Sequence, residues 1–233
     1  MADQNLIKEG VSLYNAGNYT GALTYFLSLP EDDSLDSIEL AYYLGLCYVK
    51  LGRHDDALLY LEQVVTAQGE SPETATAQRV MQCRYLLAVI YCKSGRKKLA
   101  DFELKKLLDS GYRPAAVYSS LAYLAWEDGD VDRCLDLYGK ALSEDGENPT
   151  ALNGLGYVLA DESRDLTTAL SYCKRALDFA PDSAACLDSL GWCYYRMGLY
   201  SEAKKFLSRA KKKSPQDAVI ESHLKAATEA DEE

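Results

Sequence analysis

The sequence predicts an all-α protein built from repeated pairs of antiparallel helices. Three stretches of the chain align with one another, Leu44–Gly52, Leu155–Leu159 and Leu190–Gly198. A second observation is the spacing of the glycines expected at the turns: Gly17, Gly52, Gly95, Gly129 and Gly198. Their intervals are 35, 43, 34 and 69 residues, and Ser163 takes the turn inside the longest interval. A period of about 34 residues is typical of a solenoid in which each helix pair covers the next.

Small residues at fixed places in the period explain how the helices of one pair approach each other. Gly45, Gly156 and Gly191 lie on the first helices and leave room for the second helix. The second helices carry small residues at matching places: Ala22, Ala57, Ala100, Ala169 and Ala203. Large apolar residues at helical spacing then fill the space around these contacts.

The last unit carries the full pattern. Its first helix has Leu187, Leu190, Gly191 and Tyr194, and its second helix has Tyr200, Ala203, Leu207 and Ala210 before Pro215. With this pattern the chain resembles a tetratricopeptide-repeat protein along nearly its whole length. The resemblance implies a right-handed superhelical solenoid whose first helices line a concave groove. Earlier units depart from the pattern, since Ala88 and Ala122 replace the first-helix glycine and Cys134 replaces the second-helix alanine.

The period divides residues 1–233 into a single solenoid of six repeats and one additional helix. The expected repeats span residues 3–30, 38–66, 72–112, 115–147, 149–181 and 184–215. A helix over about 217–228 is expected to cap the last repeat, because an array needs a polar end for solubility. Residues 230–233 are expected to fray.

The connection between the second and third repeats is longer than the others. Ser71, Pro72 and Glu73 combine an N-cap, a first helical proline and an acid in the first turn, which predicts a helix from about Pro72 to Ser94. Gly69 is expected in the loop before it. Glu31–Ser34 is expected to form a polar turn.

Charge and composition exclude several classes of protein. The net charge is −11, so the chain repels phosphate overall, and we expect neither nucleic acid nor an anionic membrane surface as a partner. No apolar run approaches the roughly 18 residues of a membrane span, and no signal peptide is recognisable. Seven cysteines without a CxxC pair predict reduced thiols, and a cytoplasmic location is expected.

Motifs for catalysis, cofactors and metals are absent from the sequence. There is no phosphate loop, no GxGxxG and no HExxH, and the two histidines, His54 and His223, lie far apart. We therefore expect no catalytic residues, no cofactor and no metal, and a protein that is not an enzyme. Six cysteines fall on packed helix faces, whereas Cys92 points to the inner face and is the one candidate for a reactive thiol.

Aromatic residues recur on the inner face of the first helices. The resemblance places nine residues in the groove as candidate peptide contacts: Tyr42, Tyr85, Tyr123, Trp126, Asn153, Tyr157, Asp188, Trp192 and Tyr195. Aromatic residues at helical spacing also occur as packing between helices, so this alternative stays open. Exposed aromatic columns mark interaction sites, because Tyr and Trp anchor interfaces.

Acidic residues refine the expected partner. Glu127, Asp161 and Asp188 flank the aromatic residues of the C-terminal half, which favours a peptide with Lys or Arg among apolar residues. A clamp for a C-terminal carboxylate needs inner Lys and Asn residues, and only Asn153 fits that pattern.

The predicted function is a non-enzymatic scaffold or adaptor that binds a peptide segment or helix of a partner protein in the concave groove. A dedicated chaperone or assembly factor for a client protein is the alternative. An accessory subunit of an enzyme complex is a third and weaker hypothesis. No oligomeric state is predicted.

Overall fold

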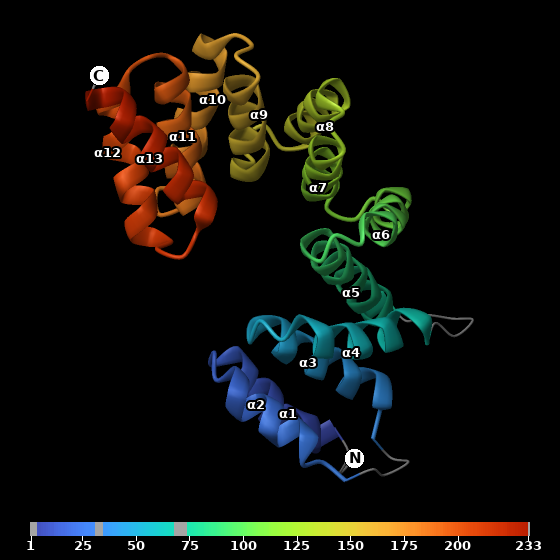
Figure 1. Ribbon diagram of the computed structural model, residues 1–233. Coiled ribbons are helices and arrows are strands. Elements are labelled where there is room, and N and C mark those ends of the chain that lie inside the picture. The colour runs from blue at the N-terminus through green and yellow to red at the C-terminus, as the bar shows by residue number, and fades with distance from the viewer. Residues whose placement is uncertain (1–3, 31–34, 68–73, 233) are drawn as a thin grey trace. The chain divides into compact units, whose positions relative to one another are not determined.

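The computed structural model describes residues 4–30, 35–67 and 74–232 (Figure 1). The described residues form thirteen helices joined by turns, without a strand. The helices are α1 Gln4–Asn15, α2 Tyr19–Leu27, α3 Ser37–Lys50, α4 His54–Thr66, α5 Thr74–Lys93, α6 Lys97–Asp109, α7 Pro114–Glu127, α8 Val131–Glu144, α9 Pro149–Asp161, α10 Leu166–Phe179, α11 Ala184–Arg196, α12 Tyr200–Lys213 and α13 Ala218–Glu232.

The chain divides into two compact units. Unit 1 comprises Met1–Tyr112 with α1 to α6, and unit 2 comprises Arg113–Glu233 with α7 to α13. In both units consecutive helices pack as pairs, and each second helix also packs on the first helix of the following pair in its unit. The predicted class, an all-α solenoid of helix pairs, is confirmed.

Each helix pair is held close by a small residue facing a large one. A Cβ atom added to Gly45 of α3 would lie 2.8 Å from Leu61 of α4. The same atom on Gly191 of α11 would lie 2.6 Å from Leu207 of α12. A side chain at either glycine would therefore force the helices apart, as the sequence pattern predicts.

The first repeat contains the same contact, which the sequence analysis missed. Gly10 of α1 faces the ring of Phe26 in α2, so that a Cβ atom at Gly10 would overlap the ring. Gly10 lies 35 residues before Gly45, and Phe26 lies 35 residues before Leu61. The small residues expected on the second helices have no exposed surface: Ala22, Ala57, Ala100, Ala169 and Ala203.

The turns within the helix pairs use the left-handed backbone conformation. All five predicted turn glycines have positive φ, and Gly198 has φ +75°. Ser163, predicted to take the turn between α9 and α10, has φ +53°, and Asp165 in the same turn has φ +42°. Non-glycine residues in this region are strained, so this turn differs from the other five.

Two helices end at other residues than the sequence predicts. α5 ends at Lys93, one residue before the predicted end, whereas its predicted start at Pro72 lies outside the described residues. The same holds for Ser71, Gly69 and the turn at residues 31–34. The last helix continues to Glu232, beyond the expected end at about residue 228, and the fraying expected at residues 230–233 stays a prediction. Neither Gly nor Pro interrupts this segment, and its alanines favour helix.

Polar contacts cross between the helices of unit 1. Arg84 of α5 and Glu103 of α6 form a largely buried ion pair with an N–O distance of 2.6 Å. The hydroxyl of Tyr91 in α5 donates a hydrogen bond of 2.6 Å to Glu62 of α4. These pairs link three successive helices and specify their register.

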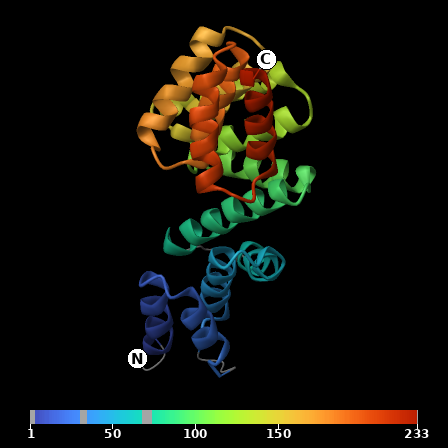
Figure 2. The same ribbon diagram turned by 60° about the vertical axis from the view of Figure 1, so that its left-hand side comes forward.

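In unit 2 the last helix completes the array. α13 runs beside α12 and also contacts α11, as the red and orange helices of Figure 2 show. Ile220 and Ala227 of α13 are buried against these helices. This packing brings His223, on the same side of α13, to α11.

Candidate functional site

The first helices of unit 2 lie next to one another. α9 contacts α7 on one side and α11 on the other, and α11 contacts α13. Residues that face the neighbouring first helix can therefore meet across helices that are far apart in sequence. The candidate site is the surface where the aromatic side chains of these four helices come together.

Five rings form a continuous series across these helices, which we call the ring row: Trp126, Tyr157, His223, Trp192 and Tyr195. Trp126 of α7 meets Tyr157 of α9 edge to face, with ring centroids 6.2 Å apart. Tyr157 lies 6.2 Å from the ring of His223. His223 stacks on Trp192 at 4.1 Å, and Trp192 stacks on Tyr195 at 4.8 Å. The structure therefore brings together four of the predicted residues and adds His223.

Asp161 at the end of α9 orients the central tryptophan. The indole N–H of Trp192 donates a hydrogen bond of 2.9 Å to the Asp161 carboxylate. Arg196 donates to the same oxygen at the longer distance of 3.4 Å and to the Ser163 hydroxyl at 2.6 Å. Its guanidinium lies 5.7 Å from the Trp192 ring centroid, which adds a cation–π contact.

Asp188 contacts a side chain of its own chain. Its two carboxylate oxygens lie 3.0 and 3.1 Å from Nδ1 of His223. The side chains of Asp188 and His223 are only 9% and 10% exposed. The carboxylate that the sequence assigned to a partner's cation is therefore paired with the last helix of its own chain.

The charges around the ring row act on Tyr157. The pKa of Tyr157 is raised to about 12, chiefly by burial and in addition by the carboxylates of Asp161 and Asp188, while Arg196 opposes the rise. The phenol is therefore neutral at physiological pH. A neutral hydroxyl on a largely apolar ring can contact both apolar groups and hydrogen-bonding groups.

Asn153 holds an unsatisfied polar atom. Its Oδ1 is buried without a hydrogen-bond partner. Asn153 lies four residues before Tyr157 on α9, so both side chains share one face of the helix. A buried acceptor that lacks a donor costs about 1–3 kcal/mol, and an incoming N–H or O–H group would remove that cost.

Tyr123 is the most exposed of the predicted residues. It lies on α7, three residues before Trp126, and 44% of its surface is accessible. Trp126, Tyr157, Trp192 and Tyr195 are half-buried. These side chains contribute to packing between helices and also present surface, so neither reading of the aromatic pattern excludes the other.

The two predicted residues of unit 1 lie in a different setting. Tyr42 of α3 is buried, its hydroxyl donates to Gln82 at 2.8 Å, and burial raises its pKa to about 12. The guanidinium of Arg79 lies 5.5 Å from the Tyr42 ring centroid and pairs with Glu39 at 2.7 Å. Tyr85 of α5 is half-buried.

Beside Tyr42 lies a cavity of about 190 Å³. Its lining residues are Asp36, Ile38, Glu39, Tyr42, Val64, Ala67 and Arg79. The ion pair of Arg79 and Glu39 forms part of this wall, so the charged groups of the cavity are already partnered within the chain.

Sequence reasoning missed the internal partners of the acidic residues. Arg196 follows Trp192 by four residues, a spacing that places both side chains on one face of the helix. The position of Arg196 beside Trp192 and Asp161 could therefore have been predicted. His223 could not, because it lies on the helix that was expected only to cap the array. Asp161 and Asp188, which were expected to face a partner, are therefore paired within unit 2.

The thiols are consistent with structural roles. The six cysteines assigned to packed faces are buried: Cys47, Cys83, Cys134, Cys173, Cys186 and Cys193. Cys92, the candidate reactive thiol, is partly exposed, but burial raises its pKa to about 11, which disfavours the thiolate. Among the described residues, no three His, Cys, Asp or Glu side chains are placed to hold a metal ion.

No helix in the described part of the chain combines the length and the apolar character that crossing a membrane requires.

Known proteins share the sequence pattern. One tetratricopeptide-repeat family model matches residues 7–72 and 104–184, and a second matches residues 160–227. A TPR repeat-containing protein of Pseudomonas aeruginosa, PA4667, is 36% identical over 176 residues. That match covers 76% of this chain but only 28% of the relative, so the chain spans less than a third of the relative's length.

Solved structures share the fold. The Cut9–Hcn1 hetero-tetramer of the APC/C matches 95% of this chain and 42% of its own, with a TM-score of 0.73 and 15% identity. A tetratricopeptide-repeat protein from Parabacteroides merdae matches 96% of this chain and 83% of its own, with a TM-score of 0.70 and 16% identity. The MamA protein matches 78% of this chain and 94% of its own, with a TM-score of 0.53 and 19% identity.

At these identities the structural likeness concerns the fold alone. The family model, in contrast, matches more than half of the sequence, and its period agrees with the helix pairs, the turn glycines and the small residues between the helices. The chain therefore belongs to the tetratricopeptide-repeat family.

Proposed function

We propose that the ring row of unit 2 binds a peptide segment or a helix of a partner protein. The tetratricopeptide-repeat fold supports a protein–protein interaction scaffold, and the finer assignment concerns where and how this chain makes its contact. The role requires no catalysis and no cofactor.

The observation that carries the proposal is the ring row together with Asn153. Rings from four helices touch one after another, and Asp161 holds Trp192 in place while Asp188 holds His223. A surface whose side chains are fixed before binding loses little conformational entropy when a partner arrives. The buried Oδ1 of Asn153 adds an acceptor for a donor that the chain itself does not provide.

The chemistry of the surface indicates the partner. Apolar side chains would pack on the rings, and a backbone N–H or side-chain donor would reach Asn153. A Lys or Arg side chain would use Asp161 in the way that Arg196 does, because that ion pair is long at 3.4 Å and both its side chains are 28% exposed. Asp188 makes a smaller contribution to this preference, because His223 already pairs with it.

A library of random peptides displayed on phage, selected against the immobilised full chain, supplies the probe. Fluorescence anisotropy then measures the affinity of a selected peptide for the purified variants. Trp126→Ala and Tyr157→Ala should each weaken binding at least tenfold, since aromatic anchors dominate interfaces. Asn153→Leu should weaken it less, by one lost hydrogen bond.

The matched control is Phe179→Ala, which removes an exposed aromatic ring from α10 in the same unit but away from the ring row. It should leave the affinity within about twofold of the parent chain. Equal losses for Phe179→Ala and Trp126→Ala, or no loss for Trp126→Ala and Tyr157→Ala with helicity preserved, would refute the proposal.

A further inference from the structure

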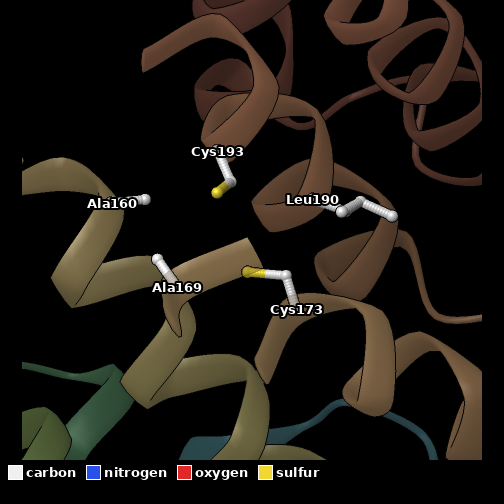
Figure 3. Close-up of a cluster of buried hydrophobic side chains, with 5 residues drawn as sticks. All are labelled: Ala160, Ala169, Cys173, Leu190 and Cys193. Atoms are coloured by element: carbon white, nitrogen blue, oxygen red, sulfur yellow. The ribbon is translucent and has the colours of Figure 1, made fainter. Parts of the chain in front are cut away.

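Two thiols from different repeats meet in the core of unit 2. Cys173 of α10 and Cys193 of α11 have no exposed surface and belong to one buried cluster with Ala160, Ala169 and Leu190. Figure 3 shows both sulfur atoms in the same space between these helices. The proposed interaction surface uses neither thiol, although Cys193 follows Trp192 directly.

The register of the repeats explains why this junction can hold two thiols. The residues in register with Cys173 in the other repeats are all large: Phe26, Leu61, Leu104, Tyr138 and Leu207. Only the repeat of α9 and α10 has a cysteine there. Its sulfur approaches Gly156 so closely that a Cβ atom on the glycine would lie 2.7 Å away. Cysteine therefore replaces a bulky side chain at the position where the next helix also contributes a thiol.

The two thiols are chemically different. Cys173 and Cys193 lie in one buried cluster, and their interaction lowers the pKa of Cys193 while it raises the pKa of Cys173. Lys174 lowers the pKa of Cys193 further. The Cys193 thiol also donates to the carbonyl of Leu166 at 3.8 Å. Of the two thiols, Cys193 has the lowered pKa and is the better candidate for the attacking sulfur, because the thiolate is the reactive form.

We propose that Cys173 and Cys193 form a redox-sensitive pair that hydrogen peroxide, or a related peroxide, converts to a disulfide joining α10 and α11. The Cys193 sulfur attacks one peroxide oxygen, the O–O bond breaks, and a sulfenic acid and one water form. The Cys173 sulfur then attacks the sulfenic sulfur, the S–O bond breaks, and a second water leaves with the thiol proton. Two thiols lose two electrons in total, and one peroxide is reduced to two waters.

Burial sets the rate of this reaction. Both thiols are covered, so the oxidant reaches them only when the junction opens locally. The turn that precedes α10 holds Ser163 and Asp165 in the left-handed region, and Leu166, the hydrogen-bond acceptor for Cys193, follows it directly. Opening of this turn would release the Cys193 thiol. Oxidation should therefore be slower than that of an exposed low-molecular-weight thiol such as glutathione.

The other buried thiols provide the contrast within the same chain. Burial raises the pKa of Cys47 and of Cys134 to about 11 and that of Cys83 to about 12. In none of the three is a second thiol among the groups that shift the pKa. These three thiols should stay reduced under conditions that oxidise the pair.

The test uses the full reduced chain, treated with hydrogen peroxide under native conditions. Free thiols are then alkylated in denaturant, and the protein is digested with trypsin. The expected product is peptide 165–174 joined to peptide 176–196, two hydrogens lighter than the sum of the separate peptides. Dithiothreitol should restore both peptides. Cys193→Ala should abolish the linked product, and Cys186→Ala, which removes the other thiol of peptide 176–196, should retain it.

Three results would overturn the proposal: both peptides remaining fully alkylated when peroxide treatment continues long after glutathione in a parallel tube is completely oxidised, a link through Cys186, or oxidation to sulfinic acid without a link. The linked peptide is detected in the wild-type chain, so the result does not depend on whether a variant folds. As a second measurement, the melting temperature of the wild-type chain should rise by several degrees on oxidation, and that of a folded Cys173→Ala variant should not. None of these readouts involves a peptide ligand, so they are independent of the proposed function.

Discussion

At the scale of single residues, the backbone conformation of the glycines and the ionisation of the tyrosines give the clearest predictions for stability. Gly198 has φ +75° in the turn between α11 and α12, whereas Gly139 lies in the middle of α8 with open space around the position of a Cβ atom. The same substitution should therefore have opposite effects at these two glycines.

Gly198→Ala should lower the free energy of unfolding by about 1–2 kcal/mol, because an L-residue is strained in the left-handed region. Gly139→Ala should raise it by about 0.5–1 kcal/mol, because alanine favours helix over glycine. Urea unfolding followed by circular dichroism measures both. If the two variants shift stability in the same direction, the assignment of the turn conformation is wrong.

Tyr157 and Tyr42 should make the fold sensitive to alkali. Both hold their phenol proton to a pKa of about 12 in the fold because they are buried, whereas an unfolded chain loses it near pH 10. Their contribution to stability is therefore complete below about pH 10 and is lost as the pH rises from about 10 to about 12. In a pH titration followed by absorbance at 295 nm, a fraction of the tyrosines should ionise only well above pH 10. Tyr157→Phe should make that fraction smaller. Complete ionisation near pH 10 with the helices intact would contradict this.

At the scale of the helix pair, stability depends on small residues at the contact between helices. Ala57 of α4 has no exposed surface, and Leu59 of the same helix is 67% exposed. The two positions therefore test the packing while the helix stays the same.

Ala57→Leu should lower the free energy of unfolding by about 1–3 kcal/mol, since the core has no room for three additional carbon atoms. Leu59→Ala should change it by less than about 0.5 kcal/mol, as is usual for a surface substitution. Chemical denaturation of the two variants beside the parent chain makes the comparison. A harmless Ala57→Leu would mean that the helices of this pair are not closely packed.

The contact of α13 with α11 depends on Asp188 and His223. His223→Ala leaves a buried carboxylate without its partner and should cost about 1–3 kcal/mol. Asp188→Asn removes the charge, so the double variant should be more stable than the sum of the two single effects implies. A double-mutant cycle in urea gives the coupling energy, and a value near zero would show that the pair does not hold α13.

At the scale of the whole molecule, local signals in the sequence predict most of the fold. The turn residues and the small residues of each helix pair take part in contacts between residues less than about 35 positions apart. The same pattern recurs in each repeat, so it is easy to recognise in the sequence. In the first repeat this recognition fails, because Gly10 is not preceded by the leucine that marks the corresponding glycine in the aligned stretches. The end of α13 was placed too early because no residue in that segment stops a helix.

The candidate site was less predictable than the fold. The positions of Trp126, Tyr157 and Trp192 follow from the repeat, so their meeting on one surface could be expected. The partners that fix them could not, because each is a contact between particular side chains of different helices. Asp161 meets Trp192 across 31 residues, and Asp188 meets His223 across 35. Such pairs decide which charges remain for a partner.

The ring row contains both tryptophans of the chain, Trp126 and Trp192. A nitrogen–proton correlation spectrum of the labelled protein therefore shows two indole signals, and both report on the proposed binding surface. Titration with a peptide selected from the phage library should shift or broaden both signals in proportion to the bound fraction. If the peptide saturates the protein and neither indole signal changes, the ring row is not the binding surface.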